Sequence, residues 1–148
     1  MKAGIIFMGP EEEFAVARER LAAACPEFDF LRTIPHWCDV IPRGVGKADG
    51  ISVLRRALKL HWSEICVFGD ADNDLDMLRT VPNAVCVANG NERAHAAARW
   101  HIGSCADGAV ASALFDIAEA ARTGATPAFM CEKNRNPRRL DEDGLPVS

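Results

Sequence analysis

The sequence predicts an α/β protein with a parallel sheet, and three observations carry that prediction. Two continuous apolar runs, residues 65–68 and 85–88, are typical of strands buried on both faces. Segments with helical periodicity precede, separate and follow these runs, which favours parallel pairing through crossover connections. An acidic loop, residues 70–76, directly follows the first run. Open α/β sheets bind ligands at such loops, beyond the carboxyl ends of their strands.

The first 42 residues predict a smaller unit in the order strand, helix, strand, strand. Residues 4–8 are strand-like, and a Gly-Pro pair followed by three glutamates is typical of a helix start. Two further short strands are expected over residues 28–33 and 37–41. The helix between the first two strands has one apolar face at i, i+3 and i+7, made by Phe14, Ala17 and Leu21.

Residues 43–121 supply the elements of the parallel sheet. Around the two buried strands we expect helices after Lys47, over residues 74–79, over residues 91–100 and over residues 109–121. Residues 101–102 form a weak strand. The expected buried faces of the first and last of these helices are Ile51, Leu54 and Leu58, and Val110, Leu114, Ile117 and Ala121.

The chain is thus expected to have three parts: residues 1–42, residues 43–121 and a polar tail over residues 122–148. The tail is rich in proline, asparagine and charge. It is expected to be flexible, with no packed element beyond a contact by Phe129 and Met130.

Composition excludes several classes of protein. The 148 residues are 49% hydrophobic and 26% charged, an ordinary globular balance. A net charge of -4 does not favour nucleic acid or an anionic membrane surface as a partner. No apolar run approaches the roughly 20 residues that span a bilayer, and the first ten residues do not resemble a secretory signal. The six scattered cysteines predict buried, reduced thiols, so a cytoplasmic location is expected.

The acidic loop is the strongest chemical signal. In Gly-Asp-Ala-Asp-Asn-Asp-Leu-Asp, the side chains of Asp70, Asn73 and Asp74 offer oxygen atoms for Mg²⁺ and contacts for a phosphate group. The structural alternative is a solvated turn with helix-capping acids. A calcium loop is a second alternative, but Leu75 replaces its sixth-position glycine and Val81 its twelfth-position glutamate.

A second signal lies at the start of the helix that precedes the first buried strand. Lys47 follows the turn-rich segment Gly-Val-Gly, and a lysine in that place can bring a positive charge to a phosphoryl group. Alone, it would be interpreted as a surface lysine. The two signals together, one helix and one strand apart, are far more specific.

At these positions the chain resembles the C-terminal half of Cof-type hydrolases, Mg²⁺-dependent phosphatases of the haloacid dehalogenase-like superfamily. The resemblance covers about residues 3–121 and is carried by residues 44–51, 68–78, 87–91 and 106–110. It implies a partial doubly wound, Rossmann-like parallel sheet over residues 43–121. It also implies that residues 1–42 are the closing part of an α/β cap domain, where this family selects substrates, so Trp37 and Asp39 are candidate substrate contacts.

The resemblance also implies roles for the two signals. Lys47 matches the family lysine that stabilises charge on the phosphate and the nucleophile. Asp70 matches a metal ligand, Asn73 a residue near the phosphate, and Asp74 an acid of the metal site that acts through water. The implied reaction is Mg²⁺-dependent hydrolysis of a small phosphorylated metabolite, such as a sugar phosphate.

One family motif has no counterpart in its usual place. Such enzymes begin with an apolar strand that ends in D-x-D-x-T, whose first aspartate forms an aspartyl-phosphate, and no such segment precedes residue 43. Asp141 and Asp143 match D-x-D-G by letters, but no apolar strand precedes them and Leu145 replaces the Thr or Ser.

Two hypotheses follow from that difference. In the first, the chain is the C-terminal part of a phosphatase, from a truncated gene, a split gene or an internal start, and lacks the nucleophile; an N-terminal fragment is then a candidate partner. In the second, it is a non-catalytic remnant that acts as a binding or oligomerisation module, because a half-sheet with an unpaired edge favours association.

Overall fold

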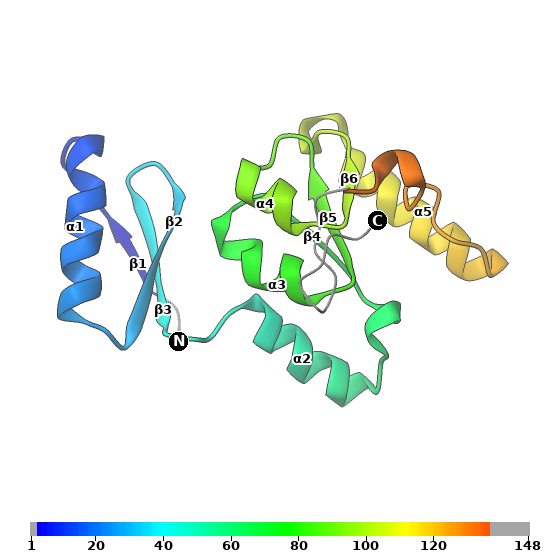
Figure 1. Cartoon of the computed structure of the whole chain (residues 1–148), viewed down its shortest axis with the longest axis horizontal. Coiled ribbons are helices and arrows are strands. Elements are labelled where there is room, and N and C mark those ends of the chain that lie inside the picture. The colour runs from blue at the N-terminus through cyan, green and yellow to red at the C-terminus, as the bar shows by residue number, and fades with distance from the viewer. Residues whose placement is uncertain (1–2, 137–148) are drawn as a thin grey trace.

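The computed structural model describes residues 3–136 and shows two sheets, each formed by one continuous part of the chain (Figure 1). The first 42 residues contain an antiparallel sheet, and residues 66–102 contain a parallel one. The expected α/β class with a parallel sheet is therefore confirmed. The D-x-D-G letters at residues 141–144, and the rest of the expected tail beyond residue 136, lie outside the described residues.

The antiparallel sheet has the strand order β1-β3-β2. Its elements follow the expected strand, helix, strand, strand order: β1 (Ala3–Ile6), α1 (Glu11–Ala24), β2 (Phe28–Ile34) and β3 (Trp37–Pro42). The apolar face expected for α1 is present: Phe14 is buried, and its ring lies 5.7 Å from that of Phe7. Helix α1 covers one face of the sheet only (Figure 1).

Successive side chains of a strand point to opposite faces of the sheet, and the two faces of this sheet have different surroundings. Leu31 pairs with Asp39 and Asp29 with Ile41, and all four side chains line a cleft on the face away from α1. Cys38 points the other way and is buried, close enough to α1 for the charge of Arg18 to act on its thiol. One face therefore forms a small core with α1, and the other borders the cleft.

The parallel sheet has the strand order β4-β5-β6, with every pair parallel. Its strands are β4 (Cys66–Gly69), β5 (Asn83–Val87) and β6 (Trp100–Ile102). The α-helices are α2 (Lys47–Leu58), α3 (Leu75–Thr80), α4 (Glu92–Ala97) and α5 (Ala109–Thr123). Short 3-10 helices lie at Trp62–Glu64, Asp72–Asp74, Cys105–Asp107 and Glu132–Asn134.

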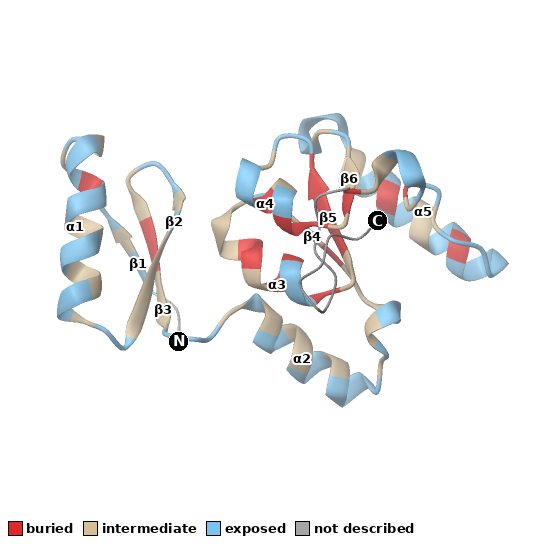
Figure 2. Ribbon diagram, in the orientation of Figure 1, coloured by how far each residue is buried: buried red, intermediate tan, exposed pale blue. Residues whose placement is uncertain are grey.

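Helices cover both faces of the parallel sheet, as its continuously apolar strands require. On one face Val67 and Cys86 pack with residues of α2, α3 and α4. On the other, Val85 and Phe68 pack with Ala113 of α5 and with the segment that follows α5. Figure 2 shows the buried residues on β5 and on parts of α3, α4 and α5.

The helical faces that pack differ from the expected ones in two places. On α2, Ile51 packs on the core, but Leu54 and Leu58 are 57% and 58% exposed, because only the first turns of the helix contact the core. On α5, Ile117 packs as expected, but Leu114 is exposed and Ala113 is buried in its place. The inner face of α5 therefore includes small side chains, which allow close approach to the sheet.

The cysteines differ in their burial. No cysteine is in a disulfide, but only Cys38 and Cys86 are buried, whereas Cys105 and Cys131 are exposed, so the expectation of uniformly buried thiols is wrong. Burial raises the pKa of Cys66 and of Cys86 to about 11, which keeps both thiols protonated. Within residues 3–136, no helix has the length and hydrophobicity needed to cross a membrane.

The segment after α5 packs on the parallel sheet up to residue 136, beyond the contact expected from Phe129 and Met130. Arg135 forms an isolated antiparallel bridge with Trp100 of β6. Asn136 is 4% exposed, and its Nδ2 donates to the carbonyl oxygens of Ala98, His95 and Ala96 at 2.8, 2.9 and 3.3 Å. This one amide satisfies carbonyl groups at the end of α4, which the helix itself leaves without partners.

We expect the substitution Asn136→Ala to lower the free energy of unfolding by about 2 kcal/mol, because it leaves the carbonyl oxygen of the buried Ala98 without this donor. Urea denaturation of the full chain measures the change. Lys133→Ala, an exposed substitution in the same segment, serves as the control. A loss of less than about 0.5 kcal/mol for Asn136→Ala, the size of an ordinary surface substitution, would contradict this role.

Candidate active site

The acidic loop begins where β4 ends, at the carboxyl edge of the parallel sheet. The backbone N–H of Asn91 donates to the carbonyl oxygen of Asp70 at 2.8 Å, which joins the loops after β4 and β5. Two glycines allow this close approach. A Cβ on Gly69 would lie 2.7 Å from the Asp74 Cβ, and one on Gly90 would lie 3.2 Å from the Asp70 Cα.

Asp74 is the central residue of the loop. It is 4% exposed, and its Oδ2 accepts from the backbone N–H groups of Asp70 and Ala71 at 3.0 and 3.3 Å. Its Oδ1 forms an ion pair with Lys47 Nζ. Burial acts to raise the pKa of Asp74, but the Lys47 ammonium and the two N–H groups outweigh it, so the pKa lies below its ordinary value. Asp74 is therefore a carboxylate at neutral pH.

Lys47 is placed by a second acid of the same loop. Asp76 Oδ2 accepts from the backbone N–H of Ala48 at 2.9 Å, at the start of α2. Gly46 makes room for that contact, since a Cβ there would lie 1.8 Å from the same oxygen. Gly46 N donates in turn to Asp49 Oδ2 at 2.7 Å. The backbone N–H groups on either side of Lys47 thus donate to Asp49 and Asp76, which fixes the start of α2 that carries the lysine.

Asp70 differs from Asp74 in its surroundings. Asp70 is exposed as a residue, but neighbouring protein atoms remove part of the water around its carboxyl group. This partial burial, followed by the nearby charge of Asp74, raises the pKa of Asp70 above the ordinary value. A hard cation would relieve that repulsion, and carboxylate oxygens are its preferred ligands. Both oxygens of Asp74 already accept protein hydrogen bonds. The pair therefore fits a cation held directly by Asp70 and through water by Asp74. Within residues 3–136 no group of three or more acid, histidine or cysteine side chains forms a complete metal site.

A cleft of about 710 Å³ lies between this loop and the antiparallel sheet, and Lys47 and Asn73 line it. A second pocket of about 520 Å³ shares Asn73 and Asp39 with the cleft. The structure thus brings Lys47, Asn73 and Asp74 together beside the cleft, with Asp70 adjacent in the same loop.

Two residues of this site carry contacts that the sequence interpretation did not assign. Asp76 supports α2, as described above. Asp72 accepts from Asn91 Nδ2 at 3.0 Å and from Arg93 at 2.8 Å, which ties the loop to the start of α4. The run of acids was the only signal for either residue, and it does not show which acid binds which helix.

Comparisons with known proteins agree with the fold. The sequence profile of the haloacid dehalogenase-like hydrolases matches residues 2–114, so the chain belongs to this family. A haloacid dehalogenase-like hydrolase from Bacteroides thetaiotaomicron has a similar structure, with a TM-score of 0.65 and 25% identity. That match covers 78% of this chain and 43% of the other.

Several curated relatives are named as phosphatases, and two of them show the extent of the similarity. The HMP-PP phosphatase of Serratia proteamaculans is 33% identical over 57% of this chain and 31% of its own length. The 5-amino-6-(5-phospho-D-ribitylamino)uracil phosphatase YbjI of Escherichia coli is 38% identical over 45% of this chain and 24% of its own length. The chain spans about a third of the length of the first curated relatives it matches.

We expect Asp74→Asn to destabilise the chain by about 2 kcal/mol at pH 7, because the ion pair with Lys47 loses its charge. The pKa of Asp74 is lowered in the folded state. The ionised carboxylate therefore stabilises the fold at pH values above 3.8, the ordinary aspartate pKa, and this stabilisation is lost as the pH falls through the folded-state pKa. The difference in urea midpoint between the two proteins should therefore shrink below pH 3.8. A difference that stays constant with pH would contradict the assignment.

Proposed function

We propose that the chain forms the phosphate-binding and metal-binding part of a phosphatase that hydrolyses small phosphate monoesters with Mg²⁺. The observation that carries this proposal is the ion pair between Lys47 and the buried Asp74, beside a cleft at the carboxyl end of β4. Ligands of open α/β sheets bind at that end. The names of the relatives support phosphate esters as substrates.

Each site residue has a role in this proposal. The Lys47 ammonium neutralises negative charge on the phosphoryl group, and the Asn73 amide donates to a phosphoryl oxygen. Asp70 holds the cation, with Asp74 contributing through water. The bound Mg²⁺ supplies further charge neutralisation. Asp74 has a second role, since it fixes the Lys47 side chain through the ion pair.

The attacking group has to come from another segment. The 148 residues contain no D-x-D-x-T sequence, and an ammonium or an amide is a poor nucleophile toward phosphorus. In the proposed reaction, an aspartate oxygen bonds to phosphorus and the alcohol leaves with a proton. Water then cleaves the acyl phosphate to give inorganic phosphate and the free carboxylate. We propose that an N-terminal segment carrying D-x-D-x-T supplies this aspartate.

In this proposal, the two N-terminal parts of the chain have the roles that the family resemblance implies. Residues 1–42 act as part of a cap over the cleft, and residues 43–121 act as half of the core domain. Six cysteines without a disulfide support a reducing, cytoplasmic location.

A second candidate function is a binding or oligomerisation module, which the free edge of β4 favours. Within the described residues, β4 pairs only with β5. An open strand edge pairs readily with another strand. Self-association with hydrophobic dye binding, and no phosphatase activity with any added fragment, would favour this alternative.

We expect Mg²⁺ to bind weakly to the isolated chain, because one exposed carboxylate and one acting through water make an incomplete shell. Titration of Mg²⁺ followed by amide chemical shifts should perturb residues 69–75 first. Asp70→Asn should remove these shifts, whereas Asp107→Asn, an exposed acid in a different loop, should leave them unchanged. Tight binding, or shifts centred elsewhere, would contradict the site.

We expect phosphatase turnover near background for the chain alone with Mg²⁺ and an aryl phosphate, because no residue within 3–136 is proposed to attack phosphorus. Addition of a fragment carrying the D-x-D-x-T segment of a relative should restore turnover. In the restored complex, Lys47→Ala and Asp70→Ala should each reduce the rate by at least about 100-fold, as loss of a charge-stabilising group does elsewhere.

The exposed substitution Glu119→Ala on α5 provides the control for the restored rate. Robust turnover by the isolated chain would contradict the proposed need for an external nucleophile. In that case, loss of turnover in Asp141→Asn would assign the nucleophile to the D-x-D-G letters.

A further inference from the structure

Helix α2 carries the proposed phosphate-binding lysine, yet few apolar contacts hold this helix in place. None of the residues Lys47–Leu58 is buried (Figure 2). Ala48 and Ile51 pack against the core, and both are only partly buried. Three glycines lie within residues 44–50, and glycine loses more conformational freedom on folding than any other residue. The position of the lysine backbone therefore depends on polar contacts.

Asp76 supplies such a contact from a rigid element. Its neighbours Leu75 and Met77 are 6% and 7% exposed, so the start of α3 is embedded in the core. From there, Asp76 Oδ2 accepts from the backbone N–H of Ala48 at 2.9 Å. Asp49 also binds at this helix start, but it belongs to α2 and bonds only to the N-cap of its own helix. Asp76 therefore joins the backbone of α2 to the core.

Lys47 is thus held at two points by acids that are two residues apart. Asp74 pairs with its ammonium, and Asp76 binds the N–H group of the next residue. The Lys47 side chain is 49% exposed, so solvent is open to an ammonium released from the pair. Ordering a lysine side chain costs up to about 2 kcal/mol. A fixed backbone lowers that cost for the arrangement in which the ammonium meets a phosphate.

The charge of Asp76 and its hydrogen bond have opposite effects on a bound phosphate. Asp76 lines the same cleft as Lys47, and a carboxylate there repels a phosphate dianion. A role through charge predicts that removal of the carboxylate strengthens phosphate binding, whereas a role through position predicts that it weakens binding. Within residues 3–136 the Asp76 side chain forms no hydrogen bond besides the one from Ala48. An asparagine would keep this bond and lose the charge.

We propose that Asp76 is a positioning residue for Lys47: it does not touch the phosphate, but its bond to the Ala48 N–H group sets the phosphate affinity through the lysine. The inference rests on the proposed function, because it takes Lys47 as the cation that meets the phosphate. This role distinguishes Asp76 from Asp70 and Asp74, which the proposed function places at the metal ion.

Titration of the full chain with inorganic phosphate and Mg²⁺, followed by amide chemical shifts, tests this role. Asp76→Ala should weaken phosphate binding about tenfold, a difference of about 1.4 kcal/mol, although it removes a repelling charge. Asp76→Asn should bind phosphate at least as tightly as the unaltered chain, because its side-chain oxygen still accepts from Ala48.

A third variant breaks the contact and keeps the charge. In Gly46→Ala, the added Cβ would lie 1.8 Å from Asp76 Oδ2, so the carboxylate has to move. The backbone of Gly46 is extended, with φ of -132°, which alanine adopts without strain. Gly46→Ala should therefore weaken phosphate binding to a similar degree as Asp76→Ala.

Hydrogen exchange at the Ala48 amide reports the contact independently of phosphate. Exchange should be faster in Asp76→Ala and Gly46→Ala and unchanged in Asp76→Asn. Lys47→Ala measures the full contribution of the lysine to phosphate affinity. Asp107→Ala, which removes an exposed acid in a different loop, is the control for loss of one negative charge.

The outcomes separate this proposal from the proposed function. Equal effects of Asp76→Ala and Asp76→Asn on phosphate affinity, in either direction, would overturn the positioning role, because the backbone contact distinguishes the two variants. Weaker binding in Lys47→Ala alone, with Asp76→Ala and Gly46→Ala unchanged, would overturn that role and leave the phosphate site intact. Phosphate affinity that does not depend on Lys47 would overturn the proposed function, and this inference with it.

Discussion

The buried carboxylate of Asp74 is the interaction on which the site depends. Through Oδ2 it closes the turn after β4 on two backbone N–H groups, and through Oδ1 it holds Lys47 on α2. A buried carboxylate without partners would be strongly destabilising, so the turn, the lysine and the acid stabilise one another. The lysine that would meet a phosphate and the loop that would meet a cation are thereby fixed by the same side chain.

The other acids of the loop extend this arrangement to the neighbouring helices. Asp76 accepts from the N–H group of Ala48 at the start of α2, and Asp72 binds Asn91 and Arg93 at the start of α4. The acid run therefore contains residues with structural contacts, Asp72 and Asp76, whereas the chemical interpretation of Asp70 and Asp74 stays a prediction. Asp70 is the acid of this group that combines exposure with a pKa raised by partial burial and by the nearby charge of Asp74.

The sequence predicted the features that depend on burial across a whole element. Strand β4 and strand β5 are apolar along their length because helices cover both faces of the sheet. The family resemblance placed Lys47 and Asp74 in one site, but their ion pair was not predicted, since no local pattern links residues on different elements. Part of the packed face of α5 was missed because Ala113 takes the place expected for Leu114. Asn136 was missed because a single amide that binds carbonyl groups leaves no periodic signal.

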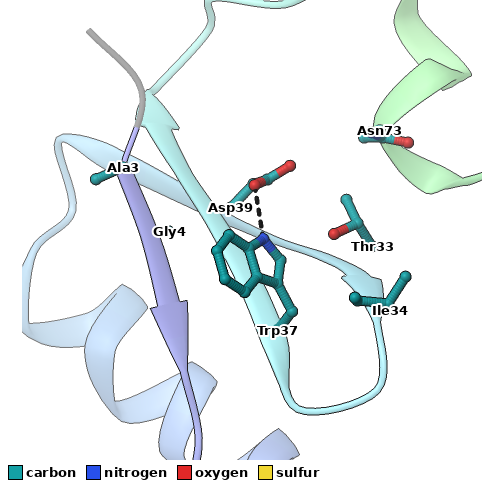
Figure 3. A pocket seen from close by; sticks show the side chains of 7 residues that line it. All are labelled: Ala3, Gly4, Thr33, Ile34, Trp37, Asp39 and Asn73. Atoms are coloured by element: carbon teal, nitrogen blue, oxygen red, sulfur yellow. Dashed lines mark hydrogen bonds between the residues drawn. The ribbon is translucent and has the colours of Figure 1, made fainter.

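The smaller pocket, which Trp37 lines (Figure 3), depends on an irregular strand pairing that the periodic pattern of the sequence does not reveal. Consecutive residues of a regular strand point to opposite faces, yet Thr33 and Ile34 both line this pocket. The pairing of β2 with β3 shifts register between Arg32 and Ile34, and such a bulge redirects side chains. Alternation alone would place one of the two residues on the α1 side of the sheet. The bulge brings the Ile34 side chain and the Thr33 hydroxyl to the same wall of the pocket. The backbone of β2 therefore shapes the surface that faces Asn73.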